Sequence, residues 1–274
     1  MTKKQRYLFD ITGYLHLKSV LTSEILRTTQ EAVNRYINTP VDQMPDGFGF
    51  TGLYQNGFAF DKCLETLTLH SVTWPIIKEL LADKPRFVRG SLKCDTHGNW
   101  QQVEKSVSNP GGLHCARDDY GRYSTRYETK DGRIYCDDLV AFFYFTDVFP
   151  GDGGLIVIPG SHKSEFERPR NLLTLDDTDG IDPKPHSVFT NITPRAGDVV
   201  LISELLTHGV LRWRPTERDR RLLVLRYKPQ YMGKSAFSPA ILDKLSAETL
   251  ELISSAPYHH IKDIVKRDVV TLTI

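Results

Sequence analysis

The spacing of apolar residues changes near residue 86, from a helix-like to a strand-like period. Between Leu21 and Tyr36 the apolar side chains recur every three or four positions, which is the period of a helix with one buried face. Residues 62–82 show the same spacing, whereas residues 41–60 are rich in Gly, Pro and Phe and predict a loop. We therefore expect the first forty residues and residues 62–82 to be largely helical.

Beyond residue 86 the chain divides into short apolar runs separated by turns rich in Gly, Pro and Asp. Many short strands with turn signals between them are typical of a β-sandwich or jelly roll. A last helix is expected over residues 237–254, with Ser238 as its N-cap and Pro239 at its first position. The predicted strands are Arg86–Lys93, Leu139–Phe145, Gly154–Ile158, Asp198–Ile202 and Leu222–Tyr227.

The length and composition suit one globular domain. The chain has 274 residues, 40% of them hydrophobic and 25% charged. We expect a single domain over residues 1–274. It would have a helical part over residues 1–85, a jelly-roll core over residues 86–230, and a C-terminal helix and tail over residues 231–274.

The charge balance argues against nucleic acid or a membrane as partner. Lys plus Arg is 35 and Asp plus Glu is 34, so the net charge is +1 and no electrostatic footprint for a polyanion is evident. No segment approaches the roughly 20 apolar residues of a membrane span, and no apolar signal-peptide core follows the basic N-terminus. The four cysteines are scattered without a CxxC pair, which predicts reduced thiols in the cytoplasm. A small molecule is the expected partner.

The segment 111–119 resembles the first half of a non-haem iron site. Such a site usually has a carboxylate two residues after its histidine, because alternate side chains of a strand face the same way. Here the histidine is His114 and the second position is Ala116. The site therefore either has an open position or takes its carboxylate from elsewhere.

The second candidate ligand is His208, which follows the predicted strand Asp198–Ile202. The pair Arg220-Arg221 comes twelve residues later and opens the next strand. An inward arginine at this place could hold a carboxylate through a bidentate pair. Two histidines and a carboxylate with open positions form the facial triad of non-haem Fe(II) oxygenases.

With these residues the sequence resembles the phytanoyl-CoA dioxygenase (PhyH) family of Fe(II)/2-oxoglutarate-dependent oxygenases. The resemblance covers roughly residues 5–260. It rests on the opening segment Tyr7–Leu15, the central segment Phe145–Gly154 running on to Val157–His162, the distal motif Thr207-His208-Gly209, and Arg220-Arg221.

The resemblance implies a double-stranded β-helix core and an oxidoreductase of the dioxygenase type. His114 and His208 would bind Fe(II), and Arg220, or else Arg221, would bind the co-substrate 2-oxoglutarate. The co-substrate and O2 would be consumed, succinate would be released, and a C–H bond of the substrate would be oxidised. By strand alternation, Phe143 or Tyr144 would line the co-substrate pocket.

Ala116 departs from the family pattern and leaves three alternatives. In the first, Asp118 or Asp119 loops back to complete the metal site, which gives a hydroxylase. In the second, chloride binds iron at the position that Ala116 leaves open, as in the iron/2-oxoglutarate halogenases. In the third, the site is degenerate and holds iron weakly, because an anionic ligand is lost. Hydroxylation is the default expectation, and a non-catalytic jelly-roll binding protein is the alternative from another class.

Residues 117–133 form a long connection after His114 and suggest an active-site lid. Three arginines in it, Arg117, Arg122 and Arg126, would suit an anionic substrate such as a nucleotide. The alternative is a solvated loop whose charges are balanced by nearby acidic residues. His162 lies in a turn, and we expect it to be structural or to support the site indirectly.

Overall fold

The strands form two antiparallel sheets and a hairpin. The structure is a computed structural model that describes residues 1–98, 113–120, 125–166, 168, 187–232 and 235–254, with only the backbone of residues 119–120. The larger sheet contains, in spatial order, β1 (Tyr14–Leu17), β8 (Val199–Ser203), β5 (Leu139–Tyr144), β10 (Arg220–Pro229) and β2 (Pro85–Asp95). The smaller sheet contains β7 (Thr190–Asn191), β6 (Gly154–Val157) and β9 (His208–Leu211), and the hairpin consists of β3 (Tyr127–Lys130) and β4 (Arg133–Cys136).

The two sheets pack face to face and form a jelly-roll core. Alternation along β10 shows how: Leu222 faces the smaller sheet, whereas Leu223 and Leu225 face the opposite way. The cluster between the sheets joins residues of the larger sheet to Leu155 and Val157 of β6. The fold is thus mainly β with flanking helices, a double-stranded β-helix.

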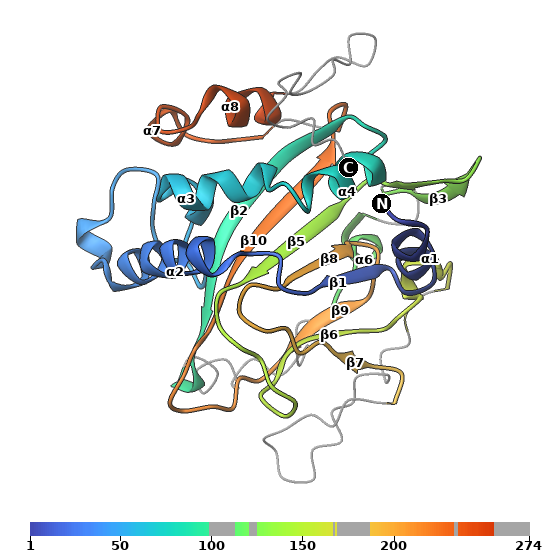
Figure 1. The fold of residues 1–274 in the computed structure, drawn as a ribbon, viewed down its shortest axis with the longest axis horizontal. Coiled ribbons are helices and arrows are strands. Elements are labelled where there is room, and N and C mark those ends of the chain that lie inside the picture. Colours follow the sequence, from blue (N-terminus) through green and yellow to red (C-terminus); the bar gives the residue numbers. More distant parts are fainter. Residues whose placement is uncertain (99–112, 121–124, 167, 169–186, 233–234, 255–274) are drawn as a thin grey trace.

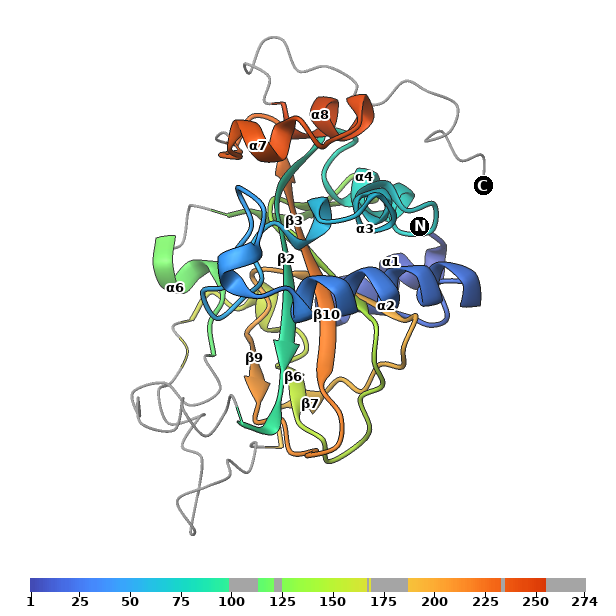
Figure 2. The same cartoon turned by 90° about the vertical axis from the view of Figure 1, so that its left-hand side faces the viewer.

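Helices cover the outer face of the larger sheet (Figures 1 and 2). A second apolar cluster joins this face to α2, where Ala32, Val33 and Tyr36 are fully buried. The helices are α1 (Lys3–Thr12), α2 (Ser23–Asn38), α3 (Lys62–Glu65), α4 (Trp74–Leu80), α6 (Ala116–Tyr120), α7 (Pro239–Leu242) and α8 (Ala247–Ile253). Among the described residues, no helix has the length and apolar character to cross a membrane.

Three expected helices are shorter or more interrupted than the sequence suggested. The first forty residues contain strand β1, because Gly13 ends α1 with a left-handed backbone (φ 80°) and turns the chain into the sheet. Residues 62–82 are broken near Thr66–Leu69, where threonine hydroxyls bond to backbone carbonyls and compete with the helix. The C-terminal helix is divided into α7 and α8, and Ser246 caps the second.

Candidate metal centre

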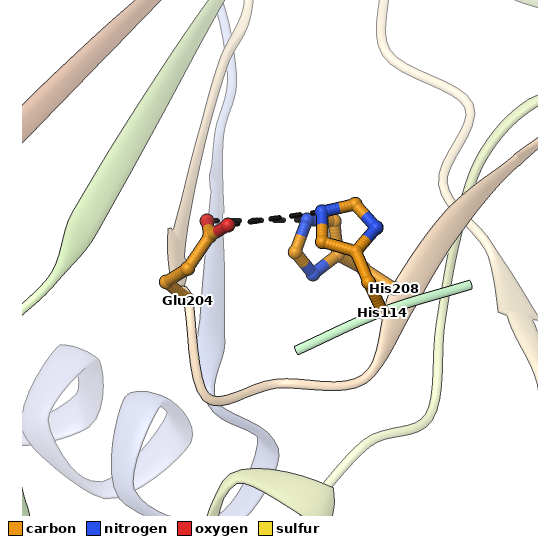
Figure 3. Close-up of side chains that lie close together, drawn as sticks. All are labelled: His114, Glu204 and His208. Carbon is orange, nitrogen blue, oxygen red and sulfur yellow. Dashed lines mark ion pairs between the residues drawn. The ribbon is translucent and has the colours of Figure 1, made fainter. Parts of the chain in front are cut away.

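His114 and His208 lie side by side, where the start of β9 pairs with the segment that precedes α6. The two residues form an isolated antiparallel bridge, and each backbone N–H donates to the other's carbonyl at 3.0 Å. Their rings are 4.2 Å apart between centroids (Figure 3). The fold therefore brings together the two histidines that the sequence singled out.

Glu204 supplies a carboxylate to the same place. Its Oε1 lies 3.7 Å from Nε2 of His114 and its Oε2 lies 4.0 Å from Nε2 of His208 (Figure 3). One potential ligand atom from each residue lies within 4.8 Å of the others. Ligand atoms around one ion at about 2.1 Å stand roughly 3 Å apart, so shifts of about 1 Å would let all three share it.

The hydrogen bonds around these side chains orient them toward a shared ion. Nδ1 of His208 lies 2.7 Å from the Leu206 carbonyl, which can only accept, so Nδ1 carries the proton and Nε2 keeps its lone pair. Nη2 of Arg226 donates to Oε1 of Glu204 at 2.7 Å. Oε2 of Glu204 is buried and has no hydrogen-bond partner among the described residues. That oxygen is the atom best placed to bind a cation.

The local charges favour the protonation states that bind metals. Burial lowers the pKa of His208, so its imidazole is neutral. Burial by itself would raise the pKa of Glu204, but the positive charge that His208 gains when it is protonated in acid, together with the Arg226 guanidinium, holds that pKa below its ordinary value. A neutral imidazole beside an ionised carboxylate is the form in which both are ligands.

Ala116 lies against Glu204. Its backbone N–H donates to the Glu204 carbonyl at 2.8 Å, and its methyl group is buried. Because α6 begins at Ala116, the chain leaves the extended conformation directly after His114. The backbones at positions 116 and 204 are therefore neighbours.

Asp118 does not loop back to complete the site. Its Oδ2 accepts a hydrogen bond from the Cys115 backbone N–H at 3.0 Å and pairs with Arg168 at 2.8 Å. These two contacts hold the Asp118 carboxylate near the start of α6, where it binds Cys115 and Arg168 and takes no part in the cluster of His114, His208 and Glu204. The side chain of Asp119, the other alternative, lies outside the described residues.

Arg220 and Arg221 point to opposite faces of the larger sheet, as strand alternation requires. Arg220 is 2% exposed, lies on the inner face and pairs with Asp95. Arg221 lies on the outer face, where it bonds to Asn34 and Asp219. Of the two alternatives, only Arg220 is placed to meet a ligand inside the barrel.

Phe143 and Tyr144 also face opposite sides of the larger sheet. Tyr144 belongs to the cluster between the sheets, whereas Phe143 packs in the outer cluster beneath the helices and contacts His70. The expectation that Phe143 lines the barrel is therefore wrong, because its place in β5 turns it outward. Tyr144 remains as the inward residue.

The arginines proposed for substrate binding are engaged with the protein or not described. Arg117 donates to the backbone carbonyls of His162 and Ser164, which ties α6 to that turn. Arg126 pairs with Asp137 and Glu128, and Arg122 lies outside the described residues.

His162 is fully buried, and its Nε2 lies 3.1 Å from the Asp10 carbonyl. Its ring packs edge-on against Tyr127 at 4.4 Å between centroids. These contacts give it a structural place in the fold.

Glu204 escaped the sequence reasoning, although the chain carries a signal for it. It is the one charged residue in the apolar run from Val199 to Leu206. A charge in a buried run is rare unless it has a partner or a function. The spacing of four residues before His208 matches no usual rule for a metal site, so spacing alone could not find it.

Comparisons with known proteins find solved structures that are similar to this fold. The HygX structure from Streptomyces hygroscopicus with nickel and 2-oxoglutarate bound is 25% identical to the chain, with a TM-score of 0.64, and the match covers 97% of this chain and 100% of HygX. EctD from S. alaskensis with 2-oxoglutarate and 5-hydroxyectoine is 18% identical, with a TM-score of 0.58, and the match covers 84% of this chain and 76% of EctD. The epimerase SnoN in complex with Fe3+, alpha ketoglutarate and nogalamycin RO is 16% identical, with a TM-score of 0.57, and the match covers 96% and 95% of the two chains. A search of curated proteins gives no match.

The family profile of phytanoyl-CoA dioxygenase (PhyH) matches residues 9–214, which is most of the chain. The matched range includes both histidines, Ala116 and Glu204. The chain therefore belongs to the phytanoyl-CoA dioxygenase (PhyH) family.

Proposed function

We propose that this protein is an Fe(II)- and 2-oxoglutarate-dependent oxygenase that hydroxylates a C–H bond of a small metabolite. The observation that carries the proposal is the convergence of His114, His208 and Glu204 on one point. The PhyH family and the relatives with a metal and 2-oxoglutarate bound support the class. The four cysteines, all of which lie in the described part of the chain, form no disulfide, which supports a reducing compartment such as the cytoplasm.

In this proposal the carboxylate ligand has moved from position 116 to position 204. His114 and His208 each offer Nε2 to Fe(II), and Glu204 offers Oε2 while Arg226 holds its Oε1. Bound iron, with 2-oxoglutarate and O2, would supply the oxidising chemistry that breaks the substrate C–H bond. The protein's part is to fix the ligand geometry and to exclude water.

The inner face of the barrel has the length that 2-oxoglutarate requires. Val157 of β6 pairs with His208, and Gly154, which lies against Nη1 of Arg220, is three residues further along β6. Three residues of a strand span about 10 Å. An extended five-carbon diacid spans about 5 Å, a metal–oxygen bond adds about 2 Å, and a hydrogen bond adds about 3 Å. The sum supports a co-substrate that reaches from the metal to Arg220.

Halogenation is the second candidate, and the buried methyl group of Ala116 favours it. A chloride on iron would need the position that an aspartate at 116 would otherwise fill. The Glu204 carboxylate already brings a negative charge to this place, and a second anion beside it would be repelled. This charge balance favours hydroxylation.

Arg117 and Arg126 already bind protein partners, which weakens the case for an anionic substrate. HygX has been seen with hygromycin B bound, and EctD with 5-hydroxyectoine. These relatives support a small polar metabolite as the substrate class.

The test is anaerobic addition of Fe(II) and 2-oxoglutarate, followed by O2. A weak visible charge-transfer band and release of succinate are expected from an oxygenase. Absence of both would instead support the non-catalytic binding protein. A chlorinated product, or a band that chloride changes, would support the halogenase.

A further inference from the structure

The inner face of the larger sheet is closely covered near the start of β10 and more open further along that strand. Leu222 and Tyr144, which are paired across β10 and β5, are buried in the cluster between the sheets. Two residues along each strand, Val224 and Phe142 are again paired, but both are only half-buried. The inner face therefore keeps an accessible apolar surface at these two side chains.

The edge strand β2 adds two polar side chains beside this apolar surface (Figure 1). Ser91 is paired with Val224, and directly paired residues of antiparallel strands face the same side. Arg89 comes two residues before Ser91 and is paired with Arg226, so it lies on the inner face as well. We call Arg89, Ser91, Val224 and Phe142 the edge patch.

The edge patch carries a positive charge that no described side chain balances. Arg89 and Arg226 are like charges at directly paired positions, an arrangement that by itself destabilises a sheet. Arg226 turns to acidic partners, since its Nη2 donates to Glu204 at 2.7 Å and its Nη1 lies 3.4 Å from Asp138. Arg89 is exposed and has no acidic partner among the described residues. An anion is therefore the ligand that complements this place.

Ser91 offers a second donor to the same anion. The residue is 3% exposed, and its Oγ is buried without a hydrogen-bond partner among the described residues. Buried hydroxyl groups are rarely left unpaired, so this oxygen points to a partner that a ligand supplies. Two residues of a strand span about 7 Å, and an oxyanion that accepts from both side chains fits between them.

The edge patch lies within reach of the candidate metal centre. Paired Cα atoms are about 5 Å apart, and an arginine side chain spans about 7 Å from Cα to guanidinium. Because the Arg226 guanidinium contacts Glu204, the Cα atom of Arg89 lies within about 15 Å of that carboxylate. The Arg89 side chain can shorten this gap by about half. A small metabolite spans what remains.

We propose that the edge patch binds an oxyanion of the substrate, a carboxylate or a phosphate, an inference that rests on the proposed function. The oxyanion accepts from the Arg89 guanidinium and the Ser91 hydroxyl, and the apolar body of the substrate packs on Val224 and Phe142. This anchor at one end fixes which C–H bond faces the metal. The substrate is thus a small anionic metabolite with an apolar body, recognised through Arg89 on the sheet.

The experiment measures the binding of three fluorinated probes to the full-length protein by 19F NMR. The probes are 4-fluorobenzoate, 4-fluorophenyl phosphate and the neutral 4-fluorobenzyl alcohol, which share an aromatic body and differ in charge. The protein is loaded with Zn(II) in place of Fe(II) and saturated with 2-oxoglutarate, which keeps the probes out of the co-substrate's own place.

Dissociation constants are compared for the wild type, Arg89→Met and Ser91→Ala. Arg133→Met is the matched control, because it removes an exposed arginine that pairs with Asp83 at the hairpin of β3 and β4. The charge-transfer band of the wild type with Fe(II) and 2-oxoglutarate is recorded separately, without O2, as the test of the proposed function.

We expect the anionic probes to bind the wild type about 10-fold more tightly than the alcohol. Arg89→Met should weaken both anions about 10-fold and Ser91→Ala about 3-fold, with the alcohol and the melting temperature unchanged. Arg133→Met should change none of the three. The anion that binds more tightly, and that loses more in Arg89→Met, identifies the oxyanion as a carboxylate or a phosphate.

The role of the edge patch is overturned if neither anion binds the wild type more tightly than the alcohol. It is also overturned if Arg89→Met and Ser91→Ala bind both anions as tightly as the wild type. In these cases the charge-transfer band still forms, so the proposed function survives. A wild type that gives no band would overturn the proposed function and, with it, the assignment of the edge patch to a substrate, even where the probes bind.

Discussion

Replacement of Glu204 by alanine should remove one of three metal ligands and leave two neutral imidazoles. Oε2 of Glu204 has no hydrogen-bond partner among the described residues. Its removal should therefore take a ligand atom from a bound cation without leaving a protein donor unpaired. Arg226 loses its bond to Oε1 but keeps Asp138 at 3.4 Å, and its side chain is 31% exposed. The fold should therefore be little affected.

The expected loss of metal affinity in Glu204→Ala follows from the kind of ligand that is removed. Loss of a residue that only supports a metal ligand typically costs 10- to 100-fold in affinity. Loss of an anionic ligand itself should cost at least about 100-fold, which is about 2.7 kcal/mol. Chloride should partly restore the affinity of Glu204→Ala, because the variant has an open position for an anion, and chloride should leave the wild type unchanged.

The assay is anaerobic titration with Fe(II), or with Co(II) as an optical probe. The double variant Glu204→Ala with Ala116→Asp should regain part of the lost affinity, because the backbone hydrogen bond between residues 116 and 204 brings position 116 close to the metal site. Ala116→Asp alone should gain nothing, since two carboxylates would then repel each other. Asp118→Ala is the matched control and should bind metal normally, because its carboxylate pairs with Arg168.

A Glu204→Ala variant that bound metal as tightly as the wild type would contradict the role of Glu204 as a metal ligand. If Asp118→Ala lost metal binding and Glu204→Ala kept it, the ligand carboxylate would be Asp118 of α6 and not Glu204. A wild type whose metal affinity rises with chloride would favour the halogenase.

Three further predictions concern the barrel wall and the buried histidine. Arg220→Lys should raise the dissociation constant of 2-oxoglutarate about 10- to 100-fold, whereas Arg221→Lys, on the outer face, should not; equal effects would contradict their opposite orientations. Gly13→Ala should destabilise the protein by about 2 to 4 kcal/mol in denaturant unfolding, because φ is +80° and a Cβ would lie 2.5 Å from Nδ1 of His162; an unchanged midpoint would refute this contact. Burial lowers the pKa of His162 from 6.5 to about 4, so the unfolded chain binds a proton first as the pH falls. Stability should fall by up to about 3 kcal/mol between pH 6.5 and 4, a loss that His162→Gln should not show if its unfolding is followed over the same range.

Five strands of the two sheets could be predicted because each is a largely buried apolar run bounded by turn residues: β2, β5, β6, β8 and β10. Leu139–Phe145 and Gly154–Ile158 differ by one residue at one end from β5 and β6. Strand β1 was missed because Tyr14–Leu17 is short and follows a helix that only the left-handed Gly13 ends. Strand β9 (His208–Leu211) could not be predicted, because Gly209 interrupts the run of strand-forming side chains and leaves too short a pattern.

The two histidines of the site could be found from family-like motifs, but the carboxylate could not. A ligand from the same strand obeys a spacing rule, whereas Glu204 reaches the site through the path of the chain between β8 and β9. That path depends on pairing between distant segments, such as His114 with His208.

A crystal structure of the protein with Fe(II) and 2-oxoglutarate, grown without O2, would test the metal centre most directly. Anomalous scattering would locate the iron. We expect Nε2 of His114, Nε2 of His208 and one oxygen of Glu204 within about 2.2 Å of it. An iron bound by the two rings, with chloride in the third place and the Glu204 carboxylate still about 4 Å from the nearest ring nitrogen, would contradict the role of Glu204 as a ligand.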